Sequence, residues 1–183
     1  LYNYKVQLER GGKIIAEKTG KLGFRSVRLL EKPKADAFLG YELEINGKII
    51  FAKGANWIPC SALENEQTPE RYRNLLESAK AANMNMIRLW GGGKFEKDAF
   101  YDICDELGLL IWHDFMFACA FYPTDTEYFG QVTAEITHQI KRLKSHPSIA
   151  MWCGDNEGMD LLNWRFAKKD REFTLNEYRK IID

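Results

Sequence analysis

The sequence predicts an α/β fold, a partial (β/α)8 TIM barrel of about four βα units preceded by strands of a β-sandwich. Residues up to about 40 alternate apolar and polar side chains, as strands do. Later residues alternate between short apolar strands and long amphipathic helices, which is the pattern of a parallel sheet with helical crossovers. The apolar strands end in polar and aromatic residues, at the strand ends where a barrel builds its site.

The amino-terminal segment predicts paired strands. Apolar residues alternate along a first strand that is followed by a two-glycine turn: Tyr2, Tyr4, Val6 and Leu8, then Gly11 and Gly12. A second alternating run covers residues 24–29, and the pattern is broken at Pro33, which lacks a backbone donor. Residues 1–40 are therefore expected to be the C-terminal part of a β-sandwich domain.

A second hairpin begins the next domain. Residues 41–45 and 49–52 flank Asn46 and Gly47, a pair that supplies the positive φ angles of a type I′ turn. We expect residues 41–183 to form the N-terminal half of a TIM-barrel domain. A complete barrel needs about 250 residues and eight strands, and about four strands are predicted here.

Three helices are predicted from apolar residues at helical spacing. The positions are Tyr72, Leu75, Leu76 and Ala79, then Phe100, Ile103, Cys104 and Leu107, then Val132, Ile136, Ile140 and Leu143. Thr68 and Pro69 suit the start of the first helix, and Gly108 suits the end of the second. Apolar strands are predicted over residues 86–90, 109–113 and 149–153.

Composition restricts the partners. The chain has 183 residues, 45% of them hydrophobic, and its 26 basic residues balance 26 acidic ones. This balance gives no electrostatic reason to expect nucleic acid or an anionic membrane, and no apolar run approaches the ~20 residues of a membrane span. The four cysteines stand singly without metal-ligand spacing, so mostly buried thiols are expected. We expect no metal, no organic cofactor and a neutral substrate.

The segment 152–157 is the sharpest chemical feature of the sequence. An apolar strand leads into Asn156 and Glu157 at the rim of the expected barrel. Glycoside cleavage needs a carboxylic acid that protonates the leaving oxygen, which is a role that Glu157 could fill. A solvated glutamate that opens the next helix explains the same pattern, because negative charge suits a helix N-terminus. Spacing alone favours neither interpretation.

Five blocks of sequence extend the first interpretation. They are KGANWIP at residues 53–59, NMNMIRLWGGG at 83–93, FYD at 100–102 with DE at 105–106, WHDFMFAC at 112–119, and WCGDNE at 152–157. In this order and spacing, over about residues 40–165, they resemble the β-mannosidases of glycoside hydrolase family 2. The resemblance implies an immunoglobulin-like sandwich before the barrel. It also implies hydrolysis of terminal non-reducing β-D-mannose residues by retaining double displacement.

The resemblance also implies roles for individual residues. Glu157 would be the acid/base, and Asn156 would contact the sugar 2-hydroxyl. Arg88 would support the charge of the nucleophile, although an arginine paired with a rim carboxylate would look the same. Trp90 would line the terminal sugar pocket or belong to the core. Asp114 would bind a sugar hydroxyl or only cap a turn.

Four further features have weaker assignments. Trp164 would line the pocket or pack the fourth loop. His113 is expected to be a core or supporting histidine, and Asp155 to be structural. The glycines at 91–93 match no phosphate-binding loop, so we expect a tight loop that lets the backbone approach the pocket.

The family's nucleophile is a glutamate that closes the seventh barrel strand. The chain is expected to lack it and to be inactive in isolation, because an acid alone supplies only part of the rate enhancement. The expected partner is a β-mannoside oligosaccharide substrate, and the family suggests a periplasmic, extracellular or lysosomal location. The alternatives are an exo-β-glucosaminidase, a β-galactosidase or a β-glucuronidase of the same family, or a carbohydrate-binding segment without activity.

Overall fold

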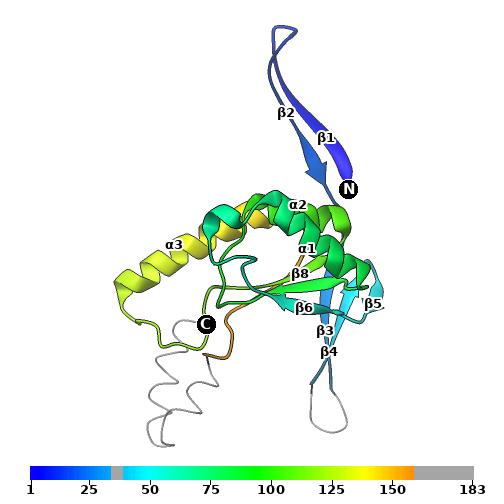
Figure 1. Ribbon diagram of the computed structural model, residues 1–183. Coiled ribbons are helices and arrows are strands. Elements are labelled where there is room, and N and C mark those ends of the chain that lie inside the picture. The colour runs from blue at the N-terminus through cyan, green and yellow to red at the C-terminus, as the bar shows by residue number, and fades with distance from the viewer. Residues whose placement is uncertain (34–38, 159–183) are drawn as a thin grey trace, which may run out of the picture.

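The computed structural model describes residues 1–33 and 39–158 (Figure 1). Within these residues the strands form two antiparallel sheets and one parallel sheet. The first sheet pairs β1 (Tyr2–Arg10) with β2 (Lys13–Leu22), the second has the order β3 (Val27–Pro33), β4 (Leu39–Ile45), β5 (Lys48–Ile50), and the third has the order β6 (Gly54–Trp57), β7 (Met86–Leu89), β8 (Leu110–Asp114), β9 (Ile149–Cys153).

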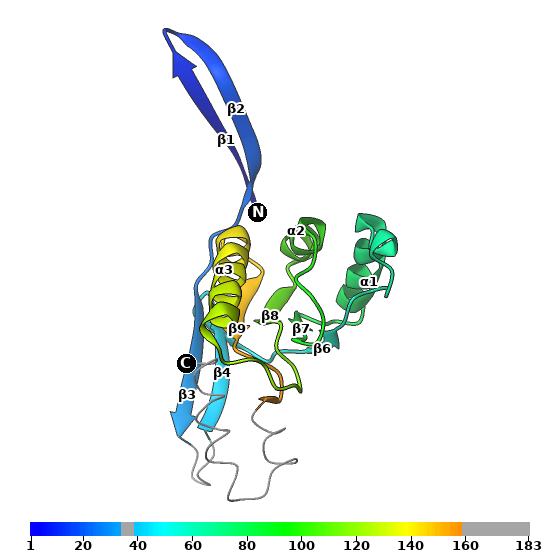
Figure 2. The same ribbon diagram turned by 90° about the vertical axis from the view of Figure 1, so that its left-hand side faces the viewer.

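The parallel sheet carries its helices on one face. The helices α1 (Pro69–Ala81), α2 (Asp98–Leu107) and α3 (Thr126–Leu143) connect its successive strands and lie side by side over it (Figure 2). A short 3-10 helix, η1 (Glu64–Glu66), precedes α1. These elements confirm the predicted α/β class, the three helices and the strands between them.

The helix ends follow from local chemistry. The Thr68 hydroxyl accepts a hydrogen bond from the Arg71 amide at 3.3 Å, as predicted for the start of α1. Asp125 caps α3 in the same way through the Tyr128 amide at 2.9 Å. Gly108 ends α2 with a φ of 65°, in the left-handed region that glycine adopts without strain.

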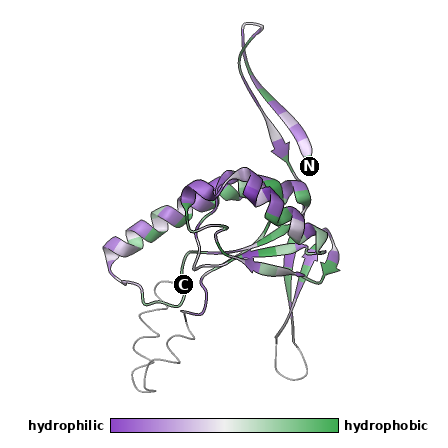
Figure 3. Ribbon diagram, in the orientation of Figure 1, coloured by the Kyte–Doolittle hydropathy of each residue, from purple (hydrophilic) through white to green (hydrophobic). Residues whose placement is uncertain are grey.

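One face of the parallel sheet builds the core. Ile87, Leu89 and Ile111 point toward the helices and pack in a buried cluster with Tyr72 and Phe100. Figure 3 shows hydrophobic residues gathered on these strands beneath the helices, whose outer surfaces are largely hydrophilic. Burial of this apolar surface is the main contribution to the stability of the layer.

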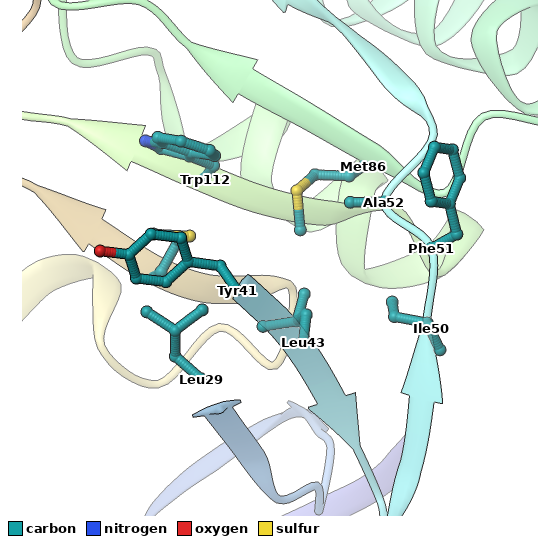
Figure 4. Close-up of a pocket in the computed structure, with 9 residues that line it drawn as sticks. Leu29, Tyr41, Leu43, Ile50, Phe51, Ala52, Met86 and Trp112 are labelled. Carbon is teal, nitrogen blue, oxygen red and sulfur yellow. The ribbon is translucent and has the colours of Figure 1, made fainter. Parts of the chain in front are cut away.

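The opposite face changes character along the strands. Met86, Trp112 and Met151 line a cavity of about 440 Å3 together with residues of the second sheet (Figure 4). Two residues further along β7 and β8 come Arg88 and Asp114, on the same face as Met86 and Trp112. This face of the sheet is therefore apolar around Met86 and Trp112 and charged at the carboxyl ends of the strands.

The hairpin β1–β2 projects away from the rest of the molecule in both views (Figures 1 and 2). Its apolar side chains Val6, Leu8 and Ile15 are more than half exposed. An ion pair between Lys21 and Glu106, 2.9 Å between the charged atoms, joins its base to α2. Among the described helices, none is both long and apolar enough to span a bilayer.

The turn between β4 and β5 has the predicted type I′ geometry, with φ of 51° at Asn46 and 74° at Gly47. The preceding strand differs from its prediction, because β3 begins at Val27 and includes Pro33. Pro33 is tolerated since β3 is an edge strand, where a missing donor costs little. Through its pairing with β4, β3 crosses the expected domain boundary after residue 40.

β3 begins at Val27 and not at residue 24, where the alternating pattern starts, because of contacts made by the residues just before it. The guanidinium of Arg25 donates to the carbonyl oxygens of Pro147, at 3.0 Å, and Ile149, at 2.6 Å. These bonds tie the segment to the start of β9, so it does not continue the alternating strand that the sequence predicts.

Leu75 is one of the apolar positions that predict α1, but it does not belong to the buried core. Leu75 is 43% exposed, whereas Tyr72 and Leu76 are fully buried. The helix buries only a narrow stripe because it is covered on one side, by α2 and the sheet.

We expect Leu76→Ala to lower the free energy of unfolding by about 2–5 kcal/mol, because it leaves a cavity in the core. The matched variant Leu75→Ala should change it by less than about 1 kcal/mol, since that side chain is exposed. Guanidinium denaturation followed by circular dichroism measures both. Equal losses in the two variants would show that the packing of α1 is wrong.

Candidate active site

Two side chains from neighbouring strands and one from the segment after β9 meet at the carboxyl ends of the parallel sheet. The Nη2 atom of Arg88, on β7, donates to Asp114 Oδ2 on β8 at 2.8 Å and to Asn156 Oδ1 after β9 at 2.9 Å. The Arg88 Nε donates to the second carboxylate oxygen of Asp114 at 3.3 Å. Because two nitrogens on one edge of the guanidinium bind the two oxygens of the carboxylate, the orientation of both groups is fixed.

Asp114 is fully buried and accepts hydrogen bonds through both of its carboxylate oxygens. Besides Arg88, the backbone amide of Gly91 donates to Asp114 Oδ2 at 3.1 Å. A side chain at Gly91 would come within 2.4 Å of the Phe117 carbonyl oxygen, so only glycine allows this approach. The tight backbone loop expected from the triple glycine is thus present.

Arg88 has two further contacts that the sequence analysis missed. Its guanidinium lies over the Trp112 ring, 5.2 Å from the centroid, in a cation–π arrangement. Its Nη1 is 3.5 Å from Asn56 Oδ1, at the end of β6. Strand geometry could have predicted both contacts. Trp112 lies two residues before Asp114 and so shares its face of the sheet, and Asn56 is in register with Arg88 on the neighbouring strand.

Asn156 is almost fully buried, and its amide orientation is set by its partners. Arg88 can only donate, so the side-chain oxygen of Asn156 faces it and the Nδ2 group points to Cys119 Sγ at 3.5 Å. The backbone is held on both sides, by Asn156 N to Phe117 O at 2.9 Å and Cys119 N to Asn156 O at 3.1 Å.

Glu157 follows with a left-handed φ of 57° and an exposed side chain. The Cys119 thiol is 3.4 Å from Glu157 Oε2. Partial loss of water contact at the sulfur, followed by the hydrogen bond to Glu157, raises the pKa of the Cys119 thiol, so it is protonated at neutral pH and donates to the carboxylate. The expectation of mostly buried cysteines fails here, because Cys119 is exposed and only Cys104 is fully buried.

His113 lies behind Asp114, on the helix-facing side of β8. Its Nδ1 is 2.7 Å from the Asp114 carbonyl oxygen, which only accepts, so Nδ1 carries the proton and Nε2 accepts from the Tyr101 hydroxyl at 2.9 Å. Burial lowers the pKa of His113 from its ordinary value of 6.5 to about 4. His113 is therefore a neutral supporting residue, in agreement with the sequence interpretation.

The remaining predicted residues have different outcomes. Trp90 follows β7, and its ring lies against Gly92. Asp155 accepts a hydrogen bond from the Gly158 amide at 3.1 Å, which gives it the structural contact that was expected. Trp164 lies outside the described residues. Substrate contacts by Trp90, Asp114 and Asn156 stay predictions.

Asp102, Asp105 and His146 lie close enough together to suggest metal ligands. Asp105 already accepts hydrogen bonds from His146 Nδ1 at 2.7 Å and from the Ser148 amide at 2.9 Å. These hydrogen bonds hold the turn before β9 in place, which explains why the three side chains lie close together.

Comparisons with known proteins identify relatives for most of the chain. No family model matches it. The chain is 50% identical to bovine (Bos taurus) β-mannosidase over 157 residues, which is 85% of the chain and 18% of that protein. It is 45% identical to mouse (Mus musculus) β-mannosidase over 181 residues, which is 97% of the chain and 21% of that protein. The chain thus spans about a fifth of the length of these relatives.

Solved structures agree. The β-D-mannosidase of Dictyoglomus thermophilum superposes with a TM-score of 0.82 at 37% identity, over 98% of this chain and 23% of that one. A β-glucuronidase of Bacteroides uniformis superposes with a TM-score of 0.71 at 23% identity, over 98% of this chain and 22% of that one, which shows the shared fold alone.

We expect stability to fall as the pH is lowered from 6.5 to about 4. In this range the unfolded chain binds a proton at His113 and the folded chain does not, so roughly 3 kcal/mol of unfolding free energy is lost. His113→Asn keeps a donor for the Asp114 carbonyl and should flatten this part of the profile. The control is His138→Asn, at an exposed position on α3, which should keep the wild-type slope. An unchanged slope in His113→Asn would contradict the assignment.

Proposed function

We propose that this chain, which is homologous to β-mannosidases over most of its length, is a segment of a retaining β-mannosidase and carries its general acid/base, Glu157. The observation that carries the proposal is the Asn156–Glu157 pair. It follows β9 at the carboxyl edge of a parallel sheet, with Asn156 held by an arginine–aspartate pair and Glu157 exposed.

The sheet supports a TIM barrel over a doubly wound fold. Its strands lie in chain order, and its described helices all cover one face, whereas a doubly wound sheet carries helices on both faces. The other face has the charged groups Arg88 and Asp114 at the carboxyl ends, where barrel enzymes place their sites. We therefore assign residues 41–183 to the first half of a (β/α)8 barrel.

Residues 1–40 are assigned to the end of an immunoglobulin-like sandwich. The exposed apolar residues of β1–β2, such as Val6 and Leu8, suit a hairpin that packs against a second sheet, because an isolated hairpin is marginally stable. In this assignment β3 is the connection between the two domains, since it pairs with β4 across the boundary.

In the proposed reaction, Glu157 protonates the departing glycosidic oxygen and then deprotonates the attacking water. Asn156 holds the sugar 2-hydroxyl through its Nδ2 group, because Arg88 occupies its oxygen. The exposed position of Glu157 gives the carboxyl access to substrate and solvent.

Direct attack needs a second carboxylate about 5–5.5 Å from the first. Asp114 is unsuited to this role because it is fully buried and paired with Arg88. We propose that a glutamate at the end of a later barrel strand is the nucleophile and that Arg88 supports its charge. A preparation of residues 1–183 alone should then be inactive.

The proposed substrate is a β-mannoside oligosaccharide. A mannoside is favoured because the 36–50% identities are to proteins named β-mannosidase, whereas the β-glucuronidase and exo-chitosanase structures reach 18–23%. A carbohydrate-binding segment without activity is the second candidate, and the kinetics of Glu157→Gln distinguish the two.

Glu157→Gln in the full-length protein should lower the hydrolysis of aryl β-mannosides by about 10²–10⁴-fold, and most for poor leaving groups, because these need an acid. Azide should restore turnover of an activated substrate and give a β-mannosyl azide, since it needs no base to attack the glycosyl enzyme. Steady-state kinetics and product analysis measure both effects.

The matched control is Glu127→Gln, in the first turn of α3, where the side chain is exposed. This variant should keep wild-type activity without azide. Near wild-type hydrolysis of poor leaving groups by Glu157→Gln would instead show that the Asn156–Glu157 pair only caps the following segment.

A further inference from the structure

The glycine at position 92 is explained by the side chain of Trp90. A Cβ atom built on Gly92 would lie 2.1 to 2.4 Å from three atoms of the six-membered part of the Trp90 indole. Carbon atoms in proteins do not approach so closely, so the ring occupies the space that any side chain at 92 would fill. The indole therefore lies directly against the backbone of its own loop.

Space is the reason for this glycine, and backbone conformation is not. The φ of Gly92 lies outside the left-handed region, so an alanine could adopt the same backbone angles. The neighbouring glycines differ. Gly91 faces backbone carbonyls of the loop after β8, and a Cβ on Gly93 would meet Pro59 and the Trp90 carbonyl no closer than 3.2 Å.

The Trp90 ring and the Gly92 backbone beneath it, here called the seat of the ring, lie on the side of the sheet that carries Arg88 and Asp114. Trp90 comes two residues after Arg88, so strand alternation directs both to the same face. The strand is kept regular up to this point, because the Trp90 amide donates to the Trp57 carbonyl at 3.1 Å. The loop then turns back through Gly93 N to Trp90 O at 2.9 Å, which brings Gly92 under the ring.

We propose that Gly92 is a positioning residue, whose missing side chain seats the Trp90 indole and thereby sets one wall of the pocket for the terminal sugar. This inference rests on the proposed function and on the role that the resemblance to β-mannosidases implies for Trp90, as a wall of that pocket. An aromatic wall needs a defined orientation, because the flat face of the ring must meet the apolar face of the sugar.

Gly92→Ala in the full-length protein tests the proposal. Displacement of the ring should lower kcat/KM for aryl β-mannosides by roughly 10- to 100-fold, the range that follows from a misplacement of about 1 Å in a binding site. Gly130→Ala on α3 is the control, because a Cβ there meets nothing within 4 Å, and it should keep wild-type kinetics. Thermal melting of both variants shows whether the fold is retained.

A double-mutant cycle separates positioning from a general effect on the fold. Phe at position 90 lacks the distal ring atoms that occupy the seat, so Gly92→Ala should cost less than about threefold in the Trp90→Phe background. The same loss in both backgrounds would overturn the proposal. If Gly92→Ala alone unfolds the protein, the double variant must regain the fold, and failure to do so would also overturn it.

A crystal structure of the Gly92→Ala protein tests the seat without any activity assay. A displaced Trp90 ring supports the inference, and an unmoved ring contradicts it. A displaced ring with unchanged kcat/KM would reject the pocket wall while leaving the acid/base untouched. Loss of the proposed function is recognised separately, by wild-type activity in Glu157→Gln.

Discussion

The pairing of Arg88 with Asp114 is the interaction on which the rest of the site depends. A fully buried carboxylate costs several kcal/mol in lost hydration unless a charge and hydrogen bonds compensate it. Arg88 supplies both, and the Gly91 amide adds a further donor. The same guanidinium reaches Asn156, so one side chain joins the ends of β7 and β8 to the segment after β9. Substituting Arg88 would leave the Asp114 carboxylate buried without a countercharge, so the ends of both strands depend on this pair.

Much of this frame could be predicted from the sequence, because strand alternation is simple geometry. Residues two apart on a strand share a face, so Arg88 and Asp114 had to lie opposite the core residues Ile87 and Ile111 once the strands were identified. The helix caps and the Asn46–Gly47 turn were predictable for the same reason, since each depends on two to four neighbouring residues. Local rules therefore found the elements and the strand ends that carry polar groups.

The contacts between loops could not be predicted in this way. Cys119 reaches Asn156 and Glu157 because the loop after β8 runs beside the end of β9, and no spacing in the sequence records that approach. The exposure of Leu75 could not be predicted for a related reason. Helical periodicity gives the direction of a side chain, but it does not tell how much of the helix surface the neighbouring elements cover. The sequence left two roles open for Arg88, support of the nucleophile's charge and pairing with a rim carboxylate, and the contacts that bear on them are not visible in the sequence. The structure shows it bound to a rim carboxylate, a contact compatible with support of a further carboxylate.

The partners of Glu157 suit the role proposed for it. Asn156 is buried and bound on all sides, so the backbone that carries Glu157 is fixed. The donor that orients the Glu157 carboxylate is a neutral thiol, which is a weak hydrogen-bond donor. A guanidinium in that place would form a stronger, charge-assisted hydrogen bond. The site thus separates its tasks: the strong charge pair between Arg88 and Asp114 holds the strand ends together, and a weak donor orients the carboxylate of Glu157, the proposed acid/base.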